Sequence, residues 1–271
     1  MSKALNLPAS PAEPDLRVSF APDQDFATAI AAALVILRRE GVVVLDDLVD
    51  PALIAQCLHE ISATYPDMSK VDRERNYGPY AGRHTMPVVV RGLLADPAIL
   101  VPKAVAKIAT ELLGAMFKVD SIGLLVAVPG APDQARHADA TLYHEARIDQ
   151  LVPPFALAFS LPLVAMDEVS GTTAFWRGSH RKQPGGEPHD FAPVVPPGSA
   201  VLWDYRTHHG GLANRGSAPR PVVFAALARE WWIDIDPPGA TRYDKLLVDR
   251  AVQAALKPAR QRRLSRAKLV D

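Results

Sequence analysis

The chain has 271 residues, with 30 Lys and Arg against 30 Asp and Glu, so its formal net charge is zero. This balance argues against a protein held on nucleic acid or on a membrane surface by bulk positive charge. A single cysteine, Cys57, excludes an intramolecular disulfide framework and any cysteine-rich zinc or iron–sulfur site. The composition is typical of a soluble, cytoplasmic globular protein, in which 25 prolines and eight unevenly spread histidines are notable.

The first third of the chain is predicted to be mainly helical. Residues 1–20 begin polar and Pro-rich and are expected to form a flexible arm. An Ala-rich helix over about 24–39 is expected to end at Gly41, and its apolar run of twelve residues is shorter than the roughly 20 that a bilayer requires. A short strand over 42–45 follows.

Two further helical segments are predicted from Asp-Pro pairs. Asp50-Pro51 supplies an N-cap and a proline at the first helical position, so a helix is expected to run from there to about Ala63, with Cys57 in its buried face. Asp96-Pro97 is expected to start one or two helices that reach about Met116. The stretch 66–87 between them is polar and is expected to be irregular.

After Phe117 the pattern changes to short apolar runs separated by turns rich in Gly and Pro. Strands are expected at 121–128, 155–163, 172–176, 200–203 and 221–230, which is typical of a β sandwich or barrel. A final helix is expected over about 241–256, and the basic end that follows is interpreted as a solvated terminus. The fold class is therefore mainly β with flanking helices.

Two segments of this β region carry residues of the types and spacing found in metal sites. His137 and Asp139 are two apart, so in an extended chain their side chains lie on the same face. A strand ending at Trp203 leads into a Gly-rich turn that carries His208 and His209. Two histidines and one carboxylate form a facial triad, which leaves three metal positions open and is diagnostic of non-haem Fe(II) oxygenases.

A further candidate is Arg220, which lies eleven residues after His209 at the head of an apolar strand. A guanidinium that points into an apolar barrel needs an anionic partner. The planar fork of arginine matches a carboxylate in bidentate fashion. If Fe(II) binds nearby, the distal carboxylate of 2-oxoglutarate is a natural partner for this side chain.

Here the sequence resembles the phytanoyl-CoA dioxygenase family. Residues 134–139, QARHAD, resemble its Q-x-x-H-x-D stretch, and residues 204–220 resemble its D-x-x-x-x-H-x-G-x-x-N-x-S-x-x-x-R pattern. The positions in register are Asp204, His209, Gly211, Asn214 and Arg220, whereas Gly216 occupies the serine position. The turn 166–171 and the loop 178–180 also resemble family segments, so the resemblance covers roughly residues 25–230.

The resemblance implies both a fold and a ligand set. His137, Asp139 and His209 would bind Fe(II), and Arg220 would bind the far carboxylate of 2-oxoglutarate with help from Gln134. The family fold is a double-stranded β-helix (a cupin-like jelly roll) with helices packed outside. We therefore expect a single dioxygenase domain over 21–271, with a helical part over about 21–116, a jelly-roll core over about 117–235 and a helix over about 241–256.

The other candidate residues are weighed against plainer roles. His144 competes with His137 as a ligand, but its neighbouring carboxylate, Glu145, would face away in a strand. His180 is interpreted as structural, His59 and His189 as solvent-exposed, and the four tryptophans as core or rim residues. The candidate substrate contacts are Tyr80, Arg83, His84, Tyr143 and His144.

The function implied by the resemblance is an Fe(II)- and 2-oxoglutarate-dependent dioxygenase. We expect it to use dioxygen to hydroxylate an unactivated C–H bond of a small molecule, with release of succinate and CO2, and with neither nucleic acid nor membrane as partner. Desaturation, cyclisation and epimerisation remain alternatives, whereas the presence of Asp139 argues against halogenation. The rivals are a non-catalytic cupin-like binding protein and another metal enzyme, such as an isomerase, on the same scaffold. Substrate identity and oligomeric state do not follow from the sequence.

Overall fold

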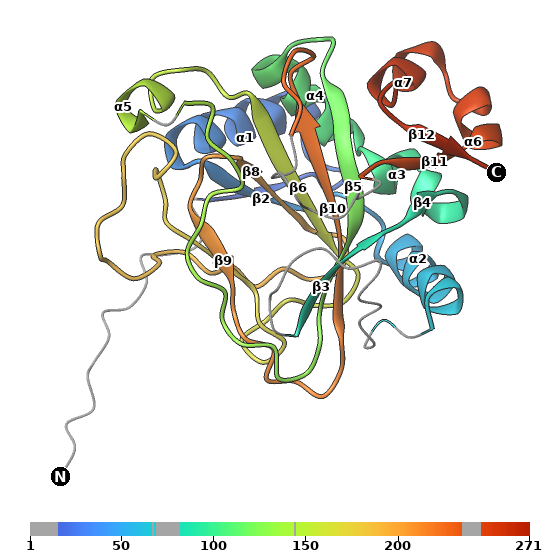
Figure 1. The fold of residues 1–271 in the computed structure, drawn as a ribbon, viewed down its shortest axis with the longest axis horizontal. Coiled ribbons are helices and arrows are strands. Elements are labelled where there is room, and N and C mark those ends of the chain that lie inside the picture. The colour runs from blue at the N-terminus through green and yellow to red at the C-terminus, as the bar shows by residue number, and fades with distance from the viewer. Residues whose placement is uncertain (1–15, 67, 69–81, 144, 235–244) are drawn as a thin grey trace.

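The computed structural model describes residues 16–66, 68, 82–143, 145–234 and 245–271. Its main element is a seven-stranded sheet (Figure 1). In spatial order the strands are β1 (Arg17–Ser19), β2 (Val42–Asp46), β8 (Ala200–Asp204), β6 (Ala156–Pro162), β10 (Arg220–Ala228), β5 (Lys118–Ala127) and β3 (Arg83–Pro87). Two smaller sheets contain β7 (Thr173–Phe175) with β9 (His209–Gly211), and β12 (Lys268–Val270) with β11 (Leu247–Asp249) and β4 (Val89–Val90).

Two helices begin at the Asp-Pro caps that the sequence predicts, and the first helix begins at a cap on Asp25. The Asp25 side chain accepts a hydrogen bond from the backbone of Thr28, and Asp50 and Asp96 cap helices that carry proline in their first turn. Gly41 ends the first helix in the left-handed conformation, with φ of 79°. The helices are α1 (Phe26–Glu40), α2 (Pro51–Thr64), the 3-10 helix η2 (Gly92–Ala95), α3 (Pro97–Leu100), α4 (Lys103–Leu113), α5 (Ala146–Asp149), α6 (Arg250–Ala255) and α7 (Pro258–Arg263).

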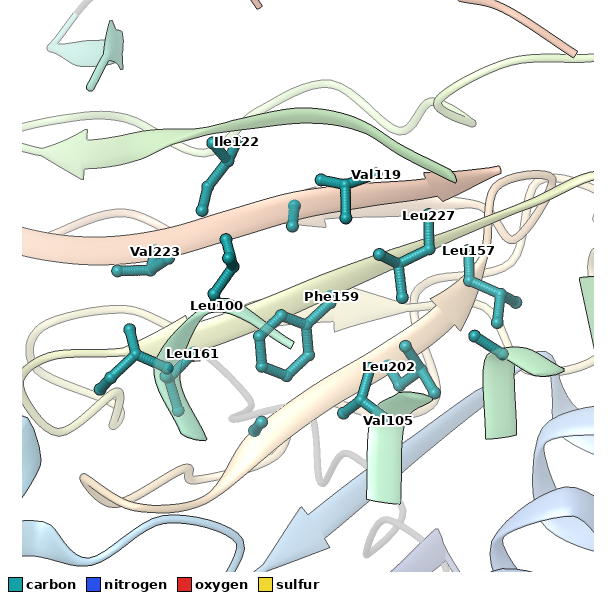
Figure 2. Close-up of a cluster of buried hydrophobic side chains, with 14 of the residues drawn as sticks. Leu100, Val105, Val119, Ile122, Leu157, Phe159, Leu161, Leu202, Val223 and Leu227 are labelled. Atoms are coloured by element: carbon teal, nitrogen blue, oxygen red, sulfur yellow. The ribbon is translucent and has the colours of Figure 1, made fainter. Parts of the chain in front are cut away.

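One face of the large sheet forms the main hydrophobic core. Because side chains alternate along a strand, Leu157, Phe159 and Leu161 of β6 all point to this face. Figure 2 shows them on the same side as Leu100 of α3 and Val105 of α4. Cys57 of α2 lies in the same core, as predicted.

The other face of the sheet encloses a second, smaller cluster and a cavity. Ala158 and Ser160 of β6 point to this side and line the cavity. The short β7–β9 sheet forms the opposite wall, and in Figure 1 β9 lies among the long loops, away from α1 and α4. The arrangement is a double-stranded β-helix, or jelly roll, with helices packed outside, which confirms the predicted fold class.

The two ends of the chain differ from the prediction. Residues 1–15 of the expected arm lie outside the described residues, but Arg17–Ser19 form β1, which pairs in parallel with β2. The prediction of a helix over 241–256 is wrong for part of the range that the structure describes, because 247–249 form β11 and only 250–255 are helical. Val248 of β11 is fully buried and β11 pairs with β4 and β12, so packing overrides the helical pattern.

The basic end is ordered by contacts that the sequence did not reveal. Residues 258–263 form α7 and 268–270 form β12, so this segment is not the solvated terminus that was expected. Leu264 is buried, and Arg266 makes an ion pair of 2.5 Å with Asp120 of β5. The expected irregular stretch 66–87 likewise contains β3 over 83–87. Within the described parts of the chain, no helix combines the length and the apolar character needed to cross a membrane.

Candidate metal and cosubstrate site

The cavity is built around a pairing between two segments that lie 72 residues apart in the sequence. His137 and His209 form an antiparallel bridge, in which each backbone N–H donates to the other carbonyl at 3.0 and 2.8 Å. The two imidazole rings lie 4.5 Å apart between centroids. On the other side of β9, Phe175 pairs with His209 and fixes it from β7. The backbone itself therefore brings the two histidines together.

Asp139 completes the group. Its backbone N–H donates to the Tyr205 carbonyl at 2.9 Å, which turns the carboxylate toward His209, and Asp139 Oδ1 lies 3.6 Å from His209 Nε2. One ligand atom from each of His137, Asp139 and His209 lies within 4.8 Å of the others. This set of two nitrogens and one oxygen, on one side of a common point, fits a divalent metal with open positions.

Hydrogen bonds fix the orientation of both imidazoles. His137 Nδ1 lies 2.9 Å from the Ala135 carbonyl, and His209 Nδ1 lies 3.0 Å from the Thr207 carbonyl. A carbonyl can only accept, so each Nδ1 carries the proton and each Nε2 has a free lone pair. Burial lowers the pKa of His209 despite the opposing charge of Asp139, which favours the neutral form that a metal ligand needs.

The site opens into a cavity of about 220 Å³ on the inner face of the sheet. Its walls are largely apolar, with Leu125, Val222 and Phe224 from β5 and β10. Two guanidinium groups, those of Arg83 and Arg220, also line it. Among the described residues that line this cavity, Asp139 is the one carboxylate. The cavity thus combines a candidate metal site with an excess of positive charge.

Arg220 lies at the first position of β10, as the sequence predicts, and its side chain is buried. Its Nη1 donates to the Gly171 carbonyl at 2.7 Å and lies 3.6 Å from Met166 Sδ. Its Nε is buried and has no hydrogen-bond partner among the described residues. Burial, and next the positive charge of Arg83, lower the pKa of Arg220 to about 10. A buried cation in this state lacks its anion.

Arg83 lies beside it because both arginines pair with the same residue. Arg83 of β3 and Arg220 of β10 flank Ala127 of β5, so the register places both side chains on one face. Arg83 Nη2 donates to the carbonyls of Pro132, Gly211 and Leu212, at 2.9, 3.0 and 2.5 Å. Its Nε and Nη1 are buried without a partner within the described residues. These donors are available to an anion.

Gln134 holds the turn between the two segments. Its backbone N–H donates to the Gly211 carbonyl and its Oε1 accepts from the Gly211 N–H, both at 2.8 Å. A Cβ on Gly211 would lie 2.7 Å from Gln134 Oε1 and 2.9 Å from Arg83 Nη1, so any larger residue at this position would force these two side chains to shift. Gln134 also lines the cavity.

The predicted substrate contacts have different outcomes. Arg83 lines the cavity, but His84 follows it on the strand and therefore points to the opposite, core-facing side, where burial lowers its pKa. Tyr143 is exposed and is not part of the cavity lining. Tyr80 and His144 lie outside the described residues. His84 is thus misplaced by the sequence prediction, because strand register was not known.

Three other histidines and Asn214 lie outside the cavity lining. His180 is buried with Nε2 3.2 Å from the Arg38 carbonyl, and His59 and His189 are exposed. Asn214 is buried, and its side chain bonds to the backbone of Ala127, Gly216 and Ala218. It closes the loop that leads from β9 to β10, which explains its position in the sequence pattern.

Trp203 is the residue that sequence reasoning missed. Its indole N–H donates to Asp139 Oδ2 at 2.9 Å, and its ring lies 5.1 Å from that of His209. The expected role of a core or rim tryptophan is therefore incomplete. The signal available in the sequence was the alternation in 200–204, which places Val201 and Trp203 on the same face of the strand.

The family model for phytanoyl-CoA dioxygenase matches residues 37–222 of this chain. The chain belongs to the phytanoyl-CoA dioxygenase family. This confirms the predicted family and, with it, the class of non-haem iron enzymes that depend on 2-oxoglutarate. The group formed by His137, Asp139 and His209 is consistent with iron binding by such an enzyme.

Solved structures with the same fold are similar over most of the chain. The epimerase SnoN in complex with Fe3+, alpha-ketoglutarate and nogalamycin RO has 20% identity and a TM-score of 0.58, covering 81% of this chain and 94% of its own. EctD from S. alaskensis, with 2-oxoglutarate and 5-hydroxyectoine, has 20% identity and a TM-score of 0.57, covering 80% and 81%. The carbocyclase SnoK from nogalamycin biosynthesis has 17% identity and a TM-score of 0.55, covering 73% and 83%. At these identities the likeness concerns the fold.

Proposed function

We propose that this protein hydroxylates an unactivated C–H bond of a small-molecule substrate, with His137, Asp139 and His209 as ligands of Fe(II). The observation that carries the proposal is the meeting of this facial group with two buried arginines in one cavity. Neither feature alone defines the chemistry. Together they provide one place for a metal and, next to it, one place for a dianionic cosubstrate.

The metal ligands are fixed before any metal binds. Each histidine presents Nε2, because its Nδ1–H is held by a backbone carbonyl. The Asp139 carboxylate presents Oδ1, because Oδ2 is held by Trp203. Three fixed ligands on one side leave the other side for the cosubstrate and dioxygen. His208 is disfavoured as a ligand because it does not line the cavity, whereas its neighbour His209 does.

Arg220 and Arg83 would hold the far carboxylate of 2-oxoglutarate. The two side chains supply three buried N–H groups that have no partner among the described residues, namely Arg83 Nε, Arg83 Nη1 and Arg220 Nε. A carboxylate between the guanidiniums would satisfy these donors and neutralise their mutual repulsion. The prediction that Arg83 contacts the substrate is thereby replaced by the proposal that it contacts the cosubstrate.

Bound iron and 2-oxoglutarate supply the oxidising chemistry, in which loss of CO2 from the cosubstrate and reduction of dioxygen are coupled to oxidation of a substrate C–H bond. The chain supplies placement. Gln134 and Gly211 are hydrogen-bonded to each other in the wall beside the metal site, and Val222 and Phe224 provide apolar lining to the cavity. Asp139 lies at the open side, where the substrate would approach.

Succinate formation tests the proposal. Purified protein with Fe(II), 2-oxoglutarate and air is screened against small molecules, and succinate and substrate mass are measured together. We expect substrate-stimulated succinate that is lost in His137→Ala, with a product that has gained one oxygen atom. A product that has lost two hydrogens would indicate desaturation or cyclisation, and one of unchanged mass epimerisation. Succinate formation that persists in His137→Ala would refute the ligand assignment.

A further inference from the structure

The Asp139 carboxylate differs from the two histidines in how it is held. Each imidazole is fixed by a carbonyl two residues earlier in its own segment. Asp139 Oδ2 instead accepts a hydrogen bond from Trp203, which is 64 residues away on β8. The Asp139 side chain is 26% exposed, so packing alone does not restrict its rotamer. Trp203 is therefore the contact that fixes this ligand from the sheet.

Trp203 is well suited to this task. It is buried on β8, which is hydrogen-bonded on both sides, to β2 and to β6. Its ring also contacts Phe175, with centroids 5.5 Å apart, so the indole cannot turn without disturbing β7. The indole N–H is a donor and never an acceptor, so it can bind only a lone pair of a carboxylate oxygen, here that of Asp139 Oδ2.

We propose that Trp203 is a positioning residue that keeps Asp139 a one-oxygen ligand, an inference that rests on the proposed metal site. A free carboxylate can bind a metal through one or both oxygens. With Oδ2 engaged by Trp203, Oδ1 faces the metal position and the adjacent position stays open for cosubstrate or dioxygen. Loss of the indole N–H would lower metal affinity without removing any ligand.

The test uses Trp203→Phe, which keeps an aromatic ring but deletes the N–H. Anaerobic titration of the full chain with Mn(II) alone measures metal affinity independently of turnover. We expect a loss of about 10- to 100-fold, the usual effect of removing an outer-shell partner. Trp232→Phe is the matched control, because the Trp232 indole is also buried but packs on Phe155 and Tyr205. The Mn(II) affinity of this variant should match that of the wild type.

A double-mutant cycle separates positioning from a general loss of structure. If Trp203 acts through Asp139, Trp203→Phe causes no further loss of Mn(II) affinity in an Asp139→Ala background. Equal losses in both backgrounds, or wild-type affinity in the single variant, would overturn the proposal. His137→Ala tests the proposed function separately. Unchanged Mn(II) binding in that variant would show that His137 is not a metal ligand and would refute the proposed metal site.

A second inference concerns the basic end, which the proposed function leaves unused. Arg260 and Arg263 of α7 meet Lys103 and Lys107 of α4 around a pocket of about 330 Å³, here called the basic pocket. Lys103 Nζ lies 4.4 Å from the centre of the Phe26 ring, and Arg263 Cζ lies 4.5 Å from that of Phe117. Lys103 and Arg263 thus each lie against an aromatic ring, while Lys103 and Lys107 are also exposed to solvent.

Carboxylates are scarce around the basic pocket. Lys107 pairs with Glu111 at 2.6 Å, but Lys103, Arg260 and Arg263 make no ion pair with any residue that the structure describes. Burial and the charge of Arg260 lower the pKa of Arg263, as expected where like charges meet. In a chain of zero net charge this concentration of cations is local, so it favours a compact, multiply charged anion.

We infer that the basic pocket binds a phosphate group, either free or as a phosphomonoester. Inorganic phosphate and glycerol 3-phosphate are the probes, titrated calorimetrically into the full chain saturated with 2-oxoglutarate so that Arg83 and Arg220 are occupied. We expect saturable binding of at least one probe, weakened about tenfold or more in Arg260→Gln and in Lys103→Gln. Lys257→Gln is the matched control, since this exposed residue precedes α7 outside the pocket lining.

The two arms distinguish the sources of the phosphate group. Tighter binding of glycerol 3-phosphate would indicate an esterified ligand, and equal binding would indicate recognition of the anion alone. Failure of both probes to bind, or an equal loss in Lys257→Gln, would overturn the inference, because diffuse surface charge would then account for the data. Loss in Arg260→Gln with retention in Lys257→Gln supports it.

Discussion

Replacing Arg220 by methionine should stabilise the free protein while weakening cosubstrate binding. Arg220 is 3% exposed, carries no carboxylate partner among the described residues and lies on the same face of the sheet as Arg83. Methionine keeps an unbranched apolar stem of similar length and removes the charge. The two effects have opposite signs because the same desolvated cation is costly without an anion and favourable with one.

The magnitude follows from the pKa of Arg220. Burial and Arg83 lower it from 12.5 to about 10, a drop of about 2.5 units. At about 1.36 kcal/mol per unit, the charged form costs the folded state about 3 kcal/mol. Loss of the hydrogen bond to the Gly171 carbonyl offsets about 1 kcal/mol of this. Arg220→Met should therefore raise the free energy of unfolding of the free protein by about 2 kcal/mol.

The effect on the cosubstrate should be larger. Truncating one partner of a buried charge pair costs about 2–5 kcal/mol, and about 1.4 kcal/mol is a factor of ten in affinity. The 2-oxoglutarate concentration needed for half-saturation should therefore rise roughly 30-fold or more. Urea unfolding of the free protein and anaerobic 2-oxoglutarate titration of the Fe(II)-loaded protein measure the two quantities.

Arg206→Met provides the contrast. Arg206 is also buried, but Asp204 accepts a hydrogen bond from Arg206 Nη2 at 2.8 Å. Burial lowers the pKa of Arg206, but the hydrogen bond and the negative charge of Asp204 outweigh it, so this pKa is raised. Its removal leaves Asp204 buried and unpaired, which should cost about 3–5 kcal/mol. If Arg220→Met destabilised the protein as Arg206→Met does, or left 2-oxoglutarate affinity unchanged, the interpretation of Arg220 as an anion site would be refuted.

Two further predictions concern a glycine and the single cysteine. Gly211→Ala places a Cβ 2.7 Å from Gln134 Oε1 and 2.9 Å from Arg83 Nη1, so it should displace both side chains and weaken 2-oxoglutarate binding by about tenfold. Gly186→Ala has no atom within 4 Å of the new Cβ and should bind as the wild type does, and equal binding by both variants would contradict the packing argument. Burial raises the pKa of Cys57 from 9.0 to about 12, so the native thiol should resist alkylation at mildly alkaline pH. Because the folded pKa is the higher one, this thiol stabilises the fold fully below about pH 9, and the contribution should fall by up to about 1.4 kcal/mol per pH unit between 9 and 12. Urea unfolding at several pH values measures this fall in the free energy of unfolding, and a Cys57→Ala variant should not show it. Rapid alkylation of Cys57 in the folded protein would contradict its burial.

The sequence was sufficient where function depends on local spacing. The interval of two residues predicted that His137 and Asp139 would lie together, and their ligand atoms do, although His137 forms an isolated bridge and Asp139 a bend rather than a strand. The interval from His209 to Arg220 places the arginine at the head of β10. The caps Asp50 and Asp96 with their prolines located two helix starts. These features are set by neighbours in the chain and need no knowledge of the fold.

Features that depend on pairing between distant strands were not predictable in this way. Arg83 and His84 were equivalent candidates until the register of β3 on β5 placed one in the cavity and the other in the core. Trp203 contacts Asp139 across 64 residues. The C-terminal segment became strand because β4 and β12 lie beside it. In each case a partner far away in the chain decides the role of the residue.

In the proposed site, His137, Asp139 and His209 together hold iron beside a bound 2-oxoglutarate. The most direct test of this arrangement is anaerobic titration of the full chain with Fe(II) and 2-oxoglutarate, monitored by visible absorption for the charge-transfer band of a chelated 2-oxo acid. We expect a band with one-to-one stoichiometry in the wild type and in His208→Ala, and its loss in His209→Ala and Asp139→Ala. A band that survives in His209→Ala but disappears in His208→Ala, or that never forms, would contradict this account.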